Sequence, residues 1–368
     1  MTDSFIEKIR NLRIGYVPIN LDLKTAPGDY RRFVEYCRHR DIDIEIATYD
    51  EKYDLVVLSQ LADITMWKDY DNGLIVYDFV DSYLGINKTN ITGLLRGLAK
   101  YLSRQNKYLN LSYWNANERM CKRADAVICS TNEQEEIISK YCKNTHVILD
   151  FHDGLIKTTK SDFLISGAIK LVWEGLPSNI NNLLSIRNVI SDLSQKYDIE
   201  MHIITDIRYH RFLGKYSEVD SLKRLKRYFK NTNIVFHEWG KKTLNLDLIS
   251  CDIALIPIDC TSSFSLGKPE NKLLLLWKNR LPVVVSDTPS YRRVMIKAGI
   301  DFTCKNENEW FKKIDSLIVD HELRKKNSEA GYRYVTKFNS TYSKLKQWDS
   351  LLKSIIRLGV KNIVVTGT

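Results

Sequence analysis

The sequence predicts an α/β protein made of two domains, each built around a mainly parallel sheet. Short apolar runs alternate with helical stretches along the whole chain. An apolar run of strand length is typical of a strand buried on both faces of a parallel sheet. The chain of 368 residues is also too long for one typical hydrophobic core, which favours two domains of about 150 to 190 residues.

Charge and cysteine content narrow the class of protein. The net charge of +10 and the pI near 9.0 predict attraction to anions, and nucleic acid, anionic lipid headgroups and nucleotide-sugars all qualify. The seven cysteines are scattered without a CxxC pair, which indicates reduced thiols rather than disulfides or a zinc site. No apolar run reaches the roughly 18 residues of a membrane span. Because the N-terminus also lacks an apolar signal core, we expect a cytoplasmic protein that could lie on the inner face of the membrane.

The first domain is expected over residues 1–155, and its first loop is a candidate ligand site. The predicted strands are 12–17, 42–47, 55–58, 74–79, 124–130 and 145–149. The loop after the first strand contains Gly28 and leads into a helix that carries Arg31 and Arg32. Sheets of this class place their ligand face at that point. A solvated helix face is the alternative for the two arginines.

Two carboxylates stand where the fourth predicted strand ends. Asp78 lies at the end of strand 74–79 and Asp81 follows it, so both are expected at the edge where parallel sheets bind ligands. A carboxylate there could accept a proton from an attacking hydroxyl group or hold acceptor hydroxyls. For Asp78, a helix cap or a paired structural acid is the alternative.

The stretch 91–123 is rich in Leu, Tyr, Lys and Arg. Apolar residues recur at helical spacing over residues 94–102, with basic residues around them. Such a basic amphipathic helix can lie on an anionic membrane surface. It can equally cover the sheet and keep one face wet. After it, the polar and unpatterned segment 151–163 marks the expected domain boundary.

The second domain is expected over residues 156–340, and its central stretch is suited to binding phosphate. The predicted strands are 169–174, 200–205, 234–237, 252–258, 281–286 and 301–302. Between the fourth and fifth strands, a loop of small polar residues leads into a helix predicted over 269–278, with Pro269 at its first position. A helix N-terminus with Lys268 and Lys272 beside it favours an anionic ligand.

The order of DIALIPI, GKPENKLL and RLPVVVSD resembles the donor-sugar half of GT-B glycosyltransferases, and it is most similar to the family 4 type. The resemblance implies two Rossmann-like domains that face each other across a cleft, with a C-terminal helix, within 341–368, that returns to the first domain. The cleft would be lined by Gly28, Arg31 and Arg32.

The same resemblance assigns donor-binding residues. Lys272, with Lys268 and Gly267 beside it, would bind the diphosphate of a nucleotide-sugar. The nucleotide would contact Gly175, Glu238, Trp239 and Glu270, although a buried core position is the alternative for Trp239. Two departures stand out: Leu275 replaces the glutamate that holds the ribose, and the Arg and Lys that the family often places after the first strand are absent between residues 173 and 185.

The expected function is therefore glycosyl transfer from a nucleotide-sugar to a glycan or lipid-linked acceptor, in bacterial polysaccharide or lipopolysaccharide synthesis. A lysine and a helix N-terminus can stabilise the leaving phosphate without a metal, so neither a metal nor another cofactor is expected. The resemblance implies retention of anomeric configuration. A nucleotide-sugar epimerase of GT-B fold is one alternative, and a basic protein that binds nucleic acid or membrane without catalysis is another. No nucleic-acid motif is present, so nucleic acid is not an expected partner.

Overall fold

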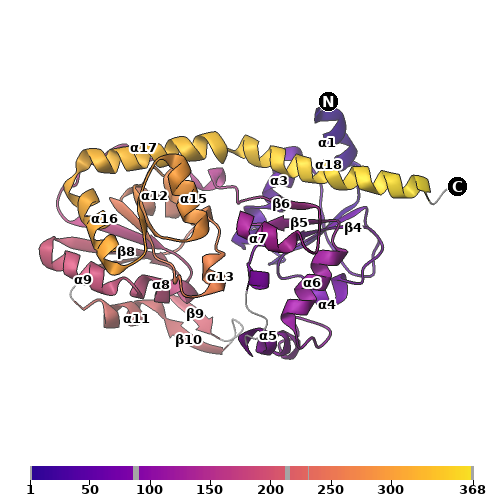
Figure 1. Ribbon diagram of the computed structural model, residues 1–368, viewed down its shortest axis with the longest axis horizontal. Helices are drawn as coiled ribbons and strands as arrows, with labels where there is room; N and C mark the ends of the chain where they lie inside the picture. Colours follow the sequence, from indigo (N-terminus) through magenta and orange to yellow (C-terminus); the bar gives the residue numbers. More distant parts are fainter. Residues whose placement is uncertain (1, 86–90, 212–215, 231, 366–368) are drawn as a thin grey trace. The chain divides into compact units, whose positions relative to one another are not determined.

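The computed structural model describes residues 2–85, 91–211, 216–230 and 232–365. The chain divides into two compact units, each with a sheet between layers of helices (Figure 1). Unit 1 comprises Met1–Phe151 and Thr341–Thr368, and unit 2 comprises His152–Ser340.

Unit 1 contains a six-stranded sheet in which all neighbouring strands are parallel. Its strands are β1 Ile14–Val17, β2 Glu45–Ile46, β3 Leu55–Leu58, β4 Leu74–Asp78, β5 Ala126–Cys129 and β6 Thr145–Val147, in the order β2-β1-β3-β4-β5-β6. The chain leaves β1 in one direction and continues from β3 in the other. The loops that follow β1 and β3 therefore diverge at a topological switch point, where sheets of this kind bind ligands.

Helices cover both faces of this sheet. They are α1 Thr2–Arg10, α2 Pro27–Tyr30, α3 Phe33–Arg40, α4 Ile64–Trp67, α5 Ile91–Leu102, α6 Tyr113–Arg123, α7 Asn132–Ile138 and α18 Thr341–Val365, with a 3₁₀ turn at Tyr83–Gly85. Alternate residues of the central strands enter two separate core clusters. One cluster contains side chains of α4 and α6, and the other contains side chains of α1, α3 and α18.

Helix α18 belongs to unit 1 because its side chains complete the second cluster. Trp348 is fully buried, and its ring centroid lies 5.3 Å from that of Phe33 and 5.6 Å from that of Tyr36. The next residue, Asp349, accepts hydrogen bonds from the hydroxyl of Tyr36 at 3.0 Å and from Nε of Arg40 at 3.2 Å. An aromatic anchor and a charged pair thus fix this helix to α3.

Unit 2 repeats the architecture with a second six-stranded parallel sheet. Its strands are β7 Ile169–Glu174, β8 Ile199–Thr205, β11 Asn233–Glu238, β12 Ile253–Ile256, β13 Val283–Ser286 and β14 Thr303–Cys304, in the order β11-β8-β7-β12-β13-β14. Here the switch point lies between β7 and β12. The predicted α/β fold with two parallel sheets is confirmed.

The helices of unit 2 are α8 Ile180–Leu184, α9 Arg187–Lys196, α11 Ser221–Tyr228, α12 Leu244–Ile249, α13 Ser263–Leu266, α14 Asn271–Lys278, α15 Pro289–Ala298, α16 Glu307–Val319 and α17 His321–Phe338, with 3₁₀ turns at Asp153–Leu155 and Pro177–Asn179. An antiparallel hairpin of β9 Arg208–Arg211 and β10 Tyr216–Asp220 was not predicted, because its polar sequence lacks an apolar alternation. In the described part of the chain, no helix combines the length and apolar character needed to cross a bilayer.

One predicted boundary near the candidate site was wrong. Helix α14 begins at Asn271 with Glu270 at its N-cap, so Pro269 precedes the helix instead of opening it. The physical reason lies one residue earlier, where the carbonyl oxygen of Lys268 accepts a hydrogen bond from the hydroxyl of Ser290 at 2.7 Å. That bond fixes the chain before the proline, and the helix starts two residues later.

Replacing Trp348 with alanine should lower the free energy of unfolding by about 3 to 5 kcal/mol, the usual cost of a Trp-to-Ala cavity. Chemical denaturation of the full chain measures the change. Tyr342→Ala on the same helix is the matched control, because Tyr342 is 64% exposed and should change stability little. Equal effects of the two substitutions would mean that α18 is not a part of the unit 1 core.

Candidate active site

The switch point of unit 2 brings two loops together at the carboxyl edge of its sheet. Nζ of Lys268, in the loop before α14, donates a hydrogen bond to Oδ1 of Asn179 after β7, at 3.2 Å. The main-chain N–H of Asp259 after β12 donates to Oδ1 of Asn182 at 3.2 Å. These two hydrogen bonds connect the chain that follows β7 with the chain that follows β12, the two strands on either side of the switch point.

Lys272 extends from the first turn of α14 to the end of β7. Its ammonium group donates a hydrogen bond to the carbonyl oxygen of Glu174 and lies 3.4 Å from Oε2 of the same residue. Nζ is also 5.6 Å from the ring centroid of Trp173, which is almost fully buried. The Lys272 side chain keeps a quarter of its surface exposed. A carbonyl, a carboxylate and an aromatic face therefore hold a cation that a ligand can still reach.

Gly175 makes this arrangement possible. A Cβ atom added to Gly175 would lie 2.8 Å from the Trp173 ring and 3.0 Å from Nζ of Lys272. Any side chain at this position would push the lysine or the tryptophan away. The predicted site residue Gly175 thus lies directly beside the predicted phosphate ligand Lys272.

Three carboxylates follow the ends of neighbouring strands at the same edge. Glu174 closes β7, Asp206 follows β8, and Glu238 closes β11. Burial raises the pKa of Asp206, and the negative charges of Glu238 and Glu174 raise it further. Sequence analysis selected Glu238 but missed Glu174 and Asp206, although a carboxylate after a strand was the signal that identified Asp78 and Asp81.

The other predicted donor residues of unit 2 occupy varied positions. Gly267 ends α13, and Glu270 is largely buried at the N-cap of α14, although its side chain accepts no capping bond. Trp239 is half-buried, and its main-chain N–H donates to the carbonyl oxygen of Thr205 at 3.1 Å. Leu275 is 3% exposed, so the place of the family's ribose glutamate is filled by core packing. No group of three His, Cys, Asp or Glu side chains among the described residues is placed to hold a metal ion.

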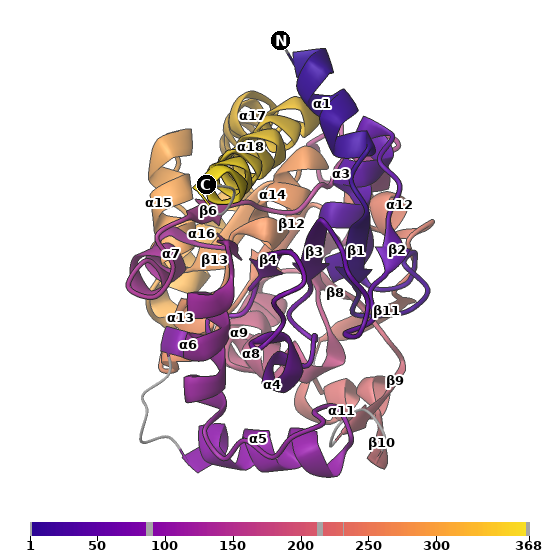
Figure 2. The same cartoon turned by 90° about the vertical axis from the view of Figure 1, so that its right-hand side faces the viewer.

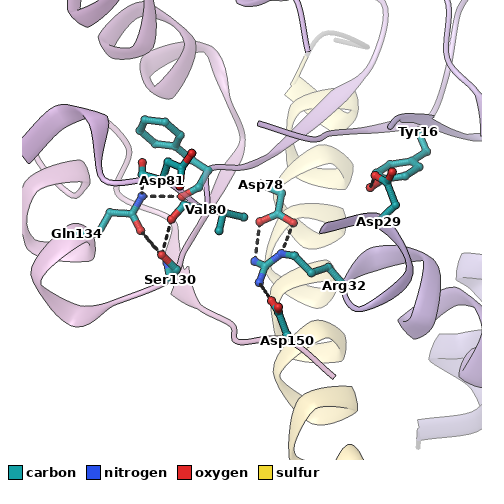
Figure 3. A network of polar contacts seen from close by, with 10 residues as sticks. Tyr16, Asp29, Arg32, Asp78, Val80, Asp81, Ser130, Gln134 and Asp150 are labelled. Carbon is teal, nitrogen blue, oxygen red and sulfur yellow. Dashed lines mark hydrogen bonds and ion pairs between the residues drawn. The ribbon is translucent and has the colours of Figure 1, made fainter. Parts of the chain in front are cut away.

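In unit 1, Asp29 organises the loop at the switch point. This fully buried carboxylate accepts a hydrogen bond from the hydroxyl of Tyr16 at 2.7 Å, and Figure 3 shows the two side chains together. It also accepts hydrogen bonds from the main-chain N–H groups of Ile19 and Asn20, both at 2.9 Å. A Cβ added to Gly28 would lie 2.4 Å from Cδ1 of Ile19. The predicted residue Gly28 therefore serves loop packing, and sequence analysis missed Asp29 itself.

Arg32 and Asp78 form a buried ion pair, which favours a structural role over their predicted roles. Nε and one terminal nitrogen of Arg32 each donate to Asp78 at 2.6 Å, and the other terminal nitrogen donates to Asp150 at 2.9 Å (Figure 3). The side chains of Arg32 and Asp78 are only 1% and 5% exposed. Burial raises the pKa of the Asp78 carboxyl, and the Arg32 guanidinium partly offsets that rise. The paired structural acid was the alternative for Asp78.

The main chain around Asp81 is fixed by β5 and α7. Gln134 donates hydrogen bonds to the carbonyl oxygens of Phe79 and Asp81, and the Ser130 hydroxyl donates to that of Val80 (Figure 3). The Asp81 side chain is half-buried at the carboxyl end of β4. Hydrogen bonds from Ser130 and Gln134 thus hold the main chain from Phe79 to Asp81.

Arg31, which precedes Arg32 in the chain, contacts the ring of its neighbour Tyr30. Its guanidinium carbon lies 5.5 Å from the ring centroid of Tyr30, and its carbonyl oxygen accepts a hydrogen bond from the N–H of Phe151 at 2.7 Å. The half-buried side chain differs from the solvated helix face that was its alternative.

Two six-stranded parallel sheets, each wound about a switch point, define the GT-B fold of glycosyltransferases. Among solved structures, that of TarM is similar, with a TM-score of 0.56 and 14% identity over 81% of this chain and 54% of TarM. A glycosyltransferase from Rickettsia africae ESF-5 has a TM-score of 0.59 and 13% identity, over 94% of this chain and 98% of that one. A UDP-forming trehalose-phosphate synthase from Burkholderia vietnamiensis has a TM-score of 0.52 and 8% identity, over 83% of this chain and 73% of that one.

The chain thus spans about half the length of TarM and nearly the whole of the Rickettsia protein. At these identities the similarity shows the fold. No protein-family model and no curated protein sequence matches the chain.

Replacing Arg32 with leucine should lower the free energy of unfolding by about 3 to 5 kcal/mol, because it leaves the buried Asp78 and the partly buried Asp150 without their counter-charge. Urea denaturation checks this result. Arg38→Leu removes an ion pair whose arginine is 64% exposed, and it should cost less than about 1 kcal/mol. Unchanged stability of the Arg32→Leu protein would contradict the structural role of Arg32 and favour a role in ligand binding.

Proposed function

We propose that this protein is a glycosyltransferase that moves a sugar from a nucleotide-activated donor to a glycan or lipid-linked acceptor. The reaction would belong to bacterial polysaccharide or lipopolysaccharide synthesis, use no metal and retain the anomeric configuration, as in family 4. Structures of similar fold support the donor class, since a TarM variant from S. aureus was solved with UDP, fondaparinux and α-GlcNAc-glycerol.

The observation that carries the proposal is the position of Lys272 at the switch point of unit 2. Glu174 neutralises this lysine at 3.4 Å, and the two opposite charges attract each other at the partly exposed edge of the sheet. A neutral hydroxyl cannot replace that attraction, whereas a phosphate carries the charge to do so. Lys272 and the start of α14 would then stabilise the negative charge that grows on the leaving phosphate.

The carboxylates on β8 and β11 suit a different part of the donor. A diphosphate would be repelled by Asp206 and Glu238, so it should lie on the side of Lys272 and Lys268. Ribose hydroxyls, in contrast, donate hydrogen bonds to carboxylates, and a carboxylate after the second strand of such a sheet is a usual ribose ligand. We infer that Asp206 takes over the ribose contact that Leu275 cannot make.

On the acceptor side, Asp81 is the proposed proton acceptor. It stands at the carboxyl end of β4 on a loop fixed by Ser130 and Gln134. A rigidly held carboxylate at that edge can accept the proton of an attacking hydroxyl group. Asp78 is proposed to hold the site in shape through Arg32 and not to react.

Calorimetry with a panel of nucleoside mono- and diphosphates tests the role of Lys272. One nucleotide should bind the wild-type chain at micromolar level, and Lys272→Ala should weaken binding by about 1.5 to 3 kcal/mol, the range for a charged hydrogen bond. Lys297→Ala is the matched control, because Lys297 is exposed on α15 of the same unit. Unchanged affinity in Lys272→Ala would remove this lysine from the phosphate site.

The ribose contact is tested by comparing a ribonucleotide with its 2′-deoxy and 3′-deoxy forms. Wild type should prefer the ribonucleotide over at least one deoxy form by about 5- to 30-fold, the effect of a buried hydrogen bond of 1 to 2 kcal/mol. Asp206→Asn should reduce that preference while Asp192→Asn, an exposed change on α9, should keep it. A preference that survives in Asp206→Asn would assign the ribose to another residue.

A further inference from the structure

Large apolar side chains are exposed on unit 1 at the C-terminal end of α5 and in the loop that follows it. Leu102 is 69% exposed, Leu109 is 49% exposed and Leu111 is 63% exposed, and Tyr101 and Tyr108 are exposed beside them. Figures 1 and 2 show α5 at the end of unit 1 opposite α1. Contiguous exposed apolar residues are typical of an interaction site. We refer to residues 101–111 as the α5–α6 segment.

The segment is folded tightly against α5, so the exposure comes from a defined structure. The N–H of Arg104 donates to the carbonyl of Tyr101 at 3.0 Å, and the N–H of Gln105 donates to that of Lys100 at 2.9 Å. This is a Schellman ending in which Arg104, at a φ of 59°, takes the left-handed position that glycine usually fills. At Gly97 the helix is so close to the segment that an added Cβ would lie 1.9 Å from the carbonyl oxygen of Asn110.

A hollow of about 540 Å³ opens in this segment. Its lining residues are Asp63, Tyr101, Leu102, Arg104, Asn106 and Lys107. Arg104 and Lys107 are exposed, and neither forms an ion pair with any residue that the structure describes. Asn106 is 4% exposed, and its amide nitrogen lacks a hydrogen-bond partner within the described chain. A buried donor without a partner is costly, which indicates a ligand that accepts its hydrogen bond.

The one acid in the lining does not oppose an anion strongly. The Asp63 carboxylate already accepts hydrogen bonds from the N–H of Thr65 at 2.9 Å, from the Thr65 hydroxyl at 2.6 Å and from the N–H of Lys107 at 2.6 Å. These three hydrogen bonds already occupy the Asp63 carboxylate, so its negative charge opposes a bound anion less strongly. Among the described residues, the Arg104 and Lys107 cations have no ion-pair partner and the Asn106 amide nitrogen has no hydrogen-bond partner, although Nζ of Lys107 lies 5.6 Å from the ring centroid of Tyr108.

We propose that the α5–α6 segment docks on an anionic membrane and that the hollow takes the phosphate of an anionic lipid. Arg104, Lys107 and Asn106 supply charge and a donor for a phosphodiester. The exposed Leu and Tyr side chains enter the boundary between headgroups and acyl chains, as apolar residues of interfacial segments do. The combination of cations with apolar side chains matches an anionic lipid better than a fully water-soluble anion. This surface lies within unit 1 and does not depend on the proposed donor site.

Sedimentation of the full chain with vesicles tests the proposal. The chain should bind vesicles of phosphatidylcholine with phosphatidylglycerol, and bind vesicles of phosphatidylcholine alone much more weakly. Raising the salt concentration should reduce binding, because exposed charges are screened within about 10 Å at 0.1 M salt. Equal binding to both kinds of vesicle would overturn the role of the two cations.

Substitutions locate the surface. Each cation near an anionic bilayer contributes about a fivefold factor in partitioning, so Arg104→Gln with Lys107→Gln should weaken binding about 25-fold. Leu102→Ser with Leu111→Ser should also reduce binding, and Asn106→Asp should weaken it by placing a carboxylate in the hollow. All variants are checked for unchanged circular dichroism and thermal unfolding.

The matched control removes the same charge elsewhere. Lys223→Gln with Lys226→Gln takes two exposed cations from α11 of unit 2 and should keep vesicle binding within about twofold. If the control pair loses as much as the Arg104 and Lys107 pair, the attraction reflects only the net charge of +10, and the proposal is overturned. Binding to duplex DNA that competes fully with vesicles and is lost in the same variants would assign the surface to nucleic acid instead.

Discussion

The contact between the Lys272 ammonium and the end of β7 depends on the chain order of unit 2. The chain passes from β7 to β8 and β11 on one side of the sheet, and returns as β12 on the other side. Lys272 therefore meets Glu174 although 98 residues separate them. The closeness of Gly175 to the lysine and to Trp173 shows that backbone, aromatic ring and cation are packed as one arrangement. A donor phosphate at this place would enter a site whose charge and shape are already set.

The two units share one sheet topology but differ in how the charged side chains near the switch point are paired and exposed. In unit 1, the charges near the switch point are directed inward: Asp29 binds its own loop, and Arg32 joins Asp78 to Asp150. In unit 2, Lys272 keeps part of its surface exposed, and carboxylates end three neighbouring strands. This difference follows from burial, since a charge that is fully buried needs fixed partners whereas a partly exposed charge can exchange them.

Local patterns in the sequence predicted most strands, because apolar runs such as 169–174 report burial directly. The strand predicted over 301–302 was misplaced, since β14 covers Thr303–Cys304. The local patterns also made Lys272 a candidate, because its setting of loop, helix start and following strand is continuous in sequence. They could not identify Glu174 as its partner, since that pairing depends on which strands become neighbours. For the same reason Arg32 and Asp78 were assigned ligand roles, although each is the other's counter-charge. The hairpin of β9 and β10 was missed because its polar residues carry no burial signal. Asp29 was missed because its partners, the Tyr16 hydroxyl and two main-chain N–H groups, come together only in the folded loop.

The carboxyl edge of unit 2 also differs in detail from the family that the sequence resembles. Leu275 packs in the core where a glutamate would hold ribose, and Asp206 provides a carboxylate on a neighbouring strand. Glu174 stands at the end of β7, and Lys268 and Lys272 near the start of α14 offer positive charge for a phosphate. A donor bound at this edge should therefore place its phosphate near Lys268 and Lys272 and its ribose hydroxyls near Asp206.

A crystal structure of the full chain with the nucleotide selected by calorimetry is the most direct test of this account. It should show a phosphate oxygen within hydrogen-bonding distance of Nζ of Lys272, with that nitrogen moved away from the Glu174 carboxylate. A nucleotide bound elsewhere, with the pair of Lys272 and Glu174 intact, would contradict it.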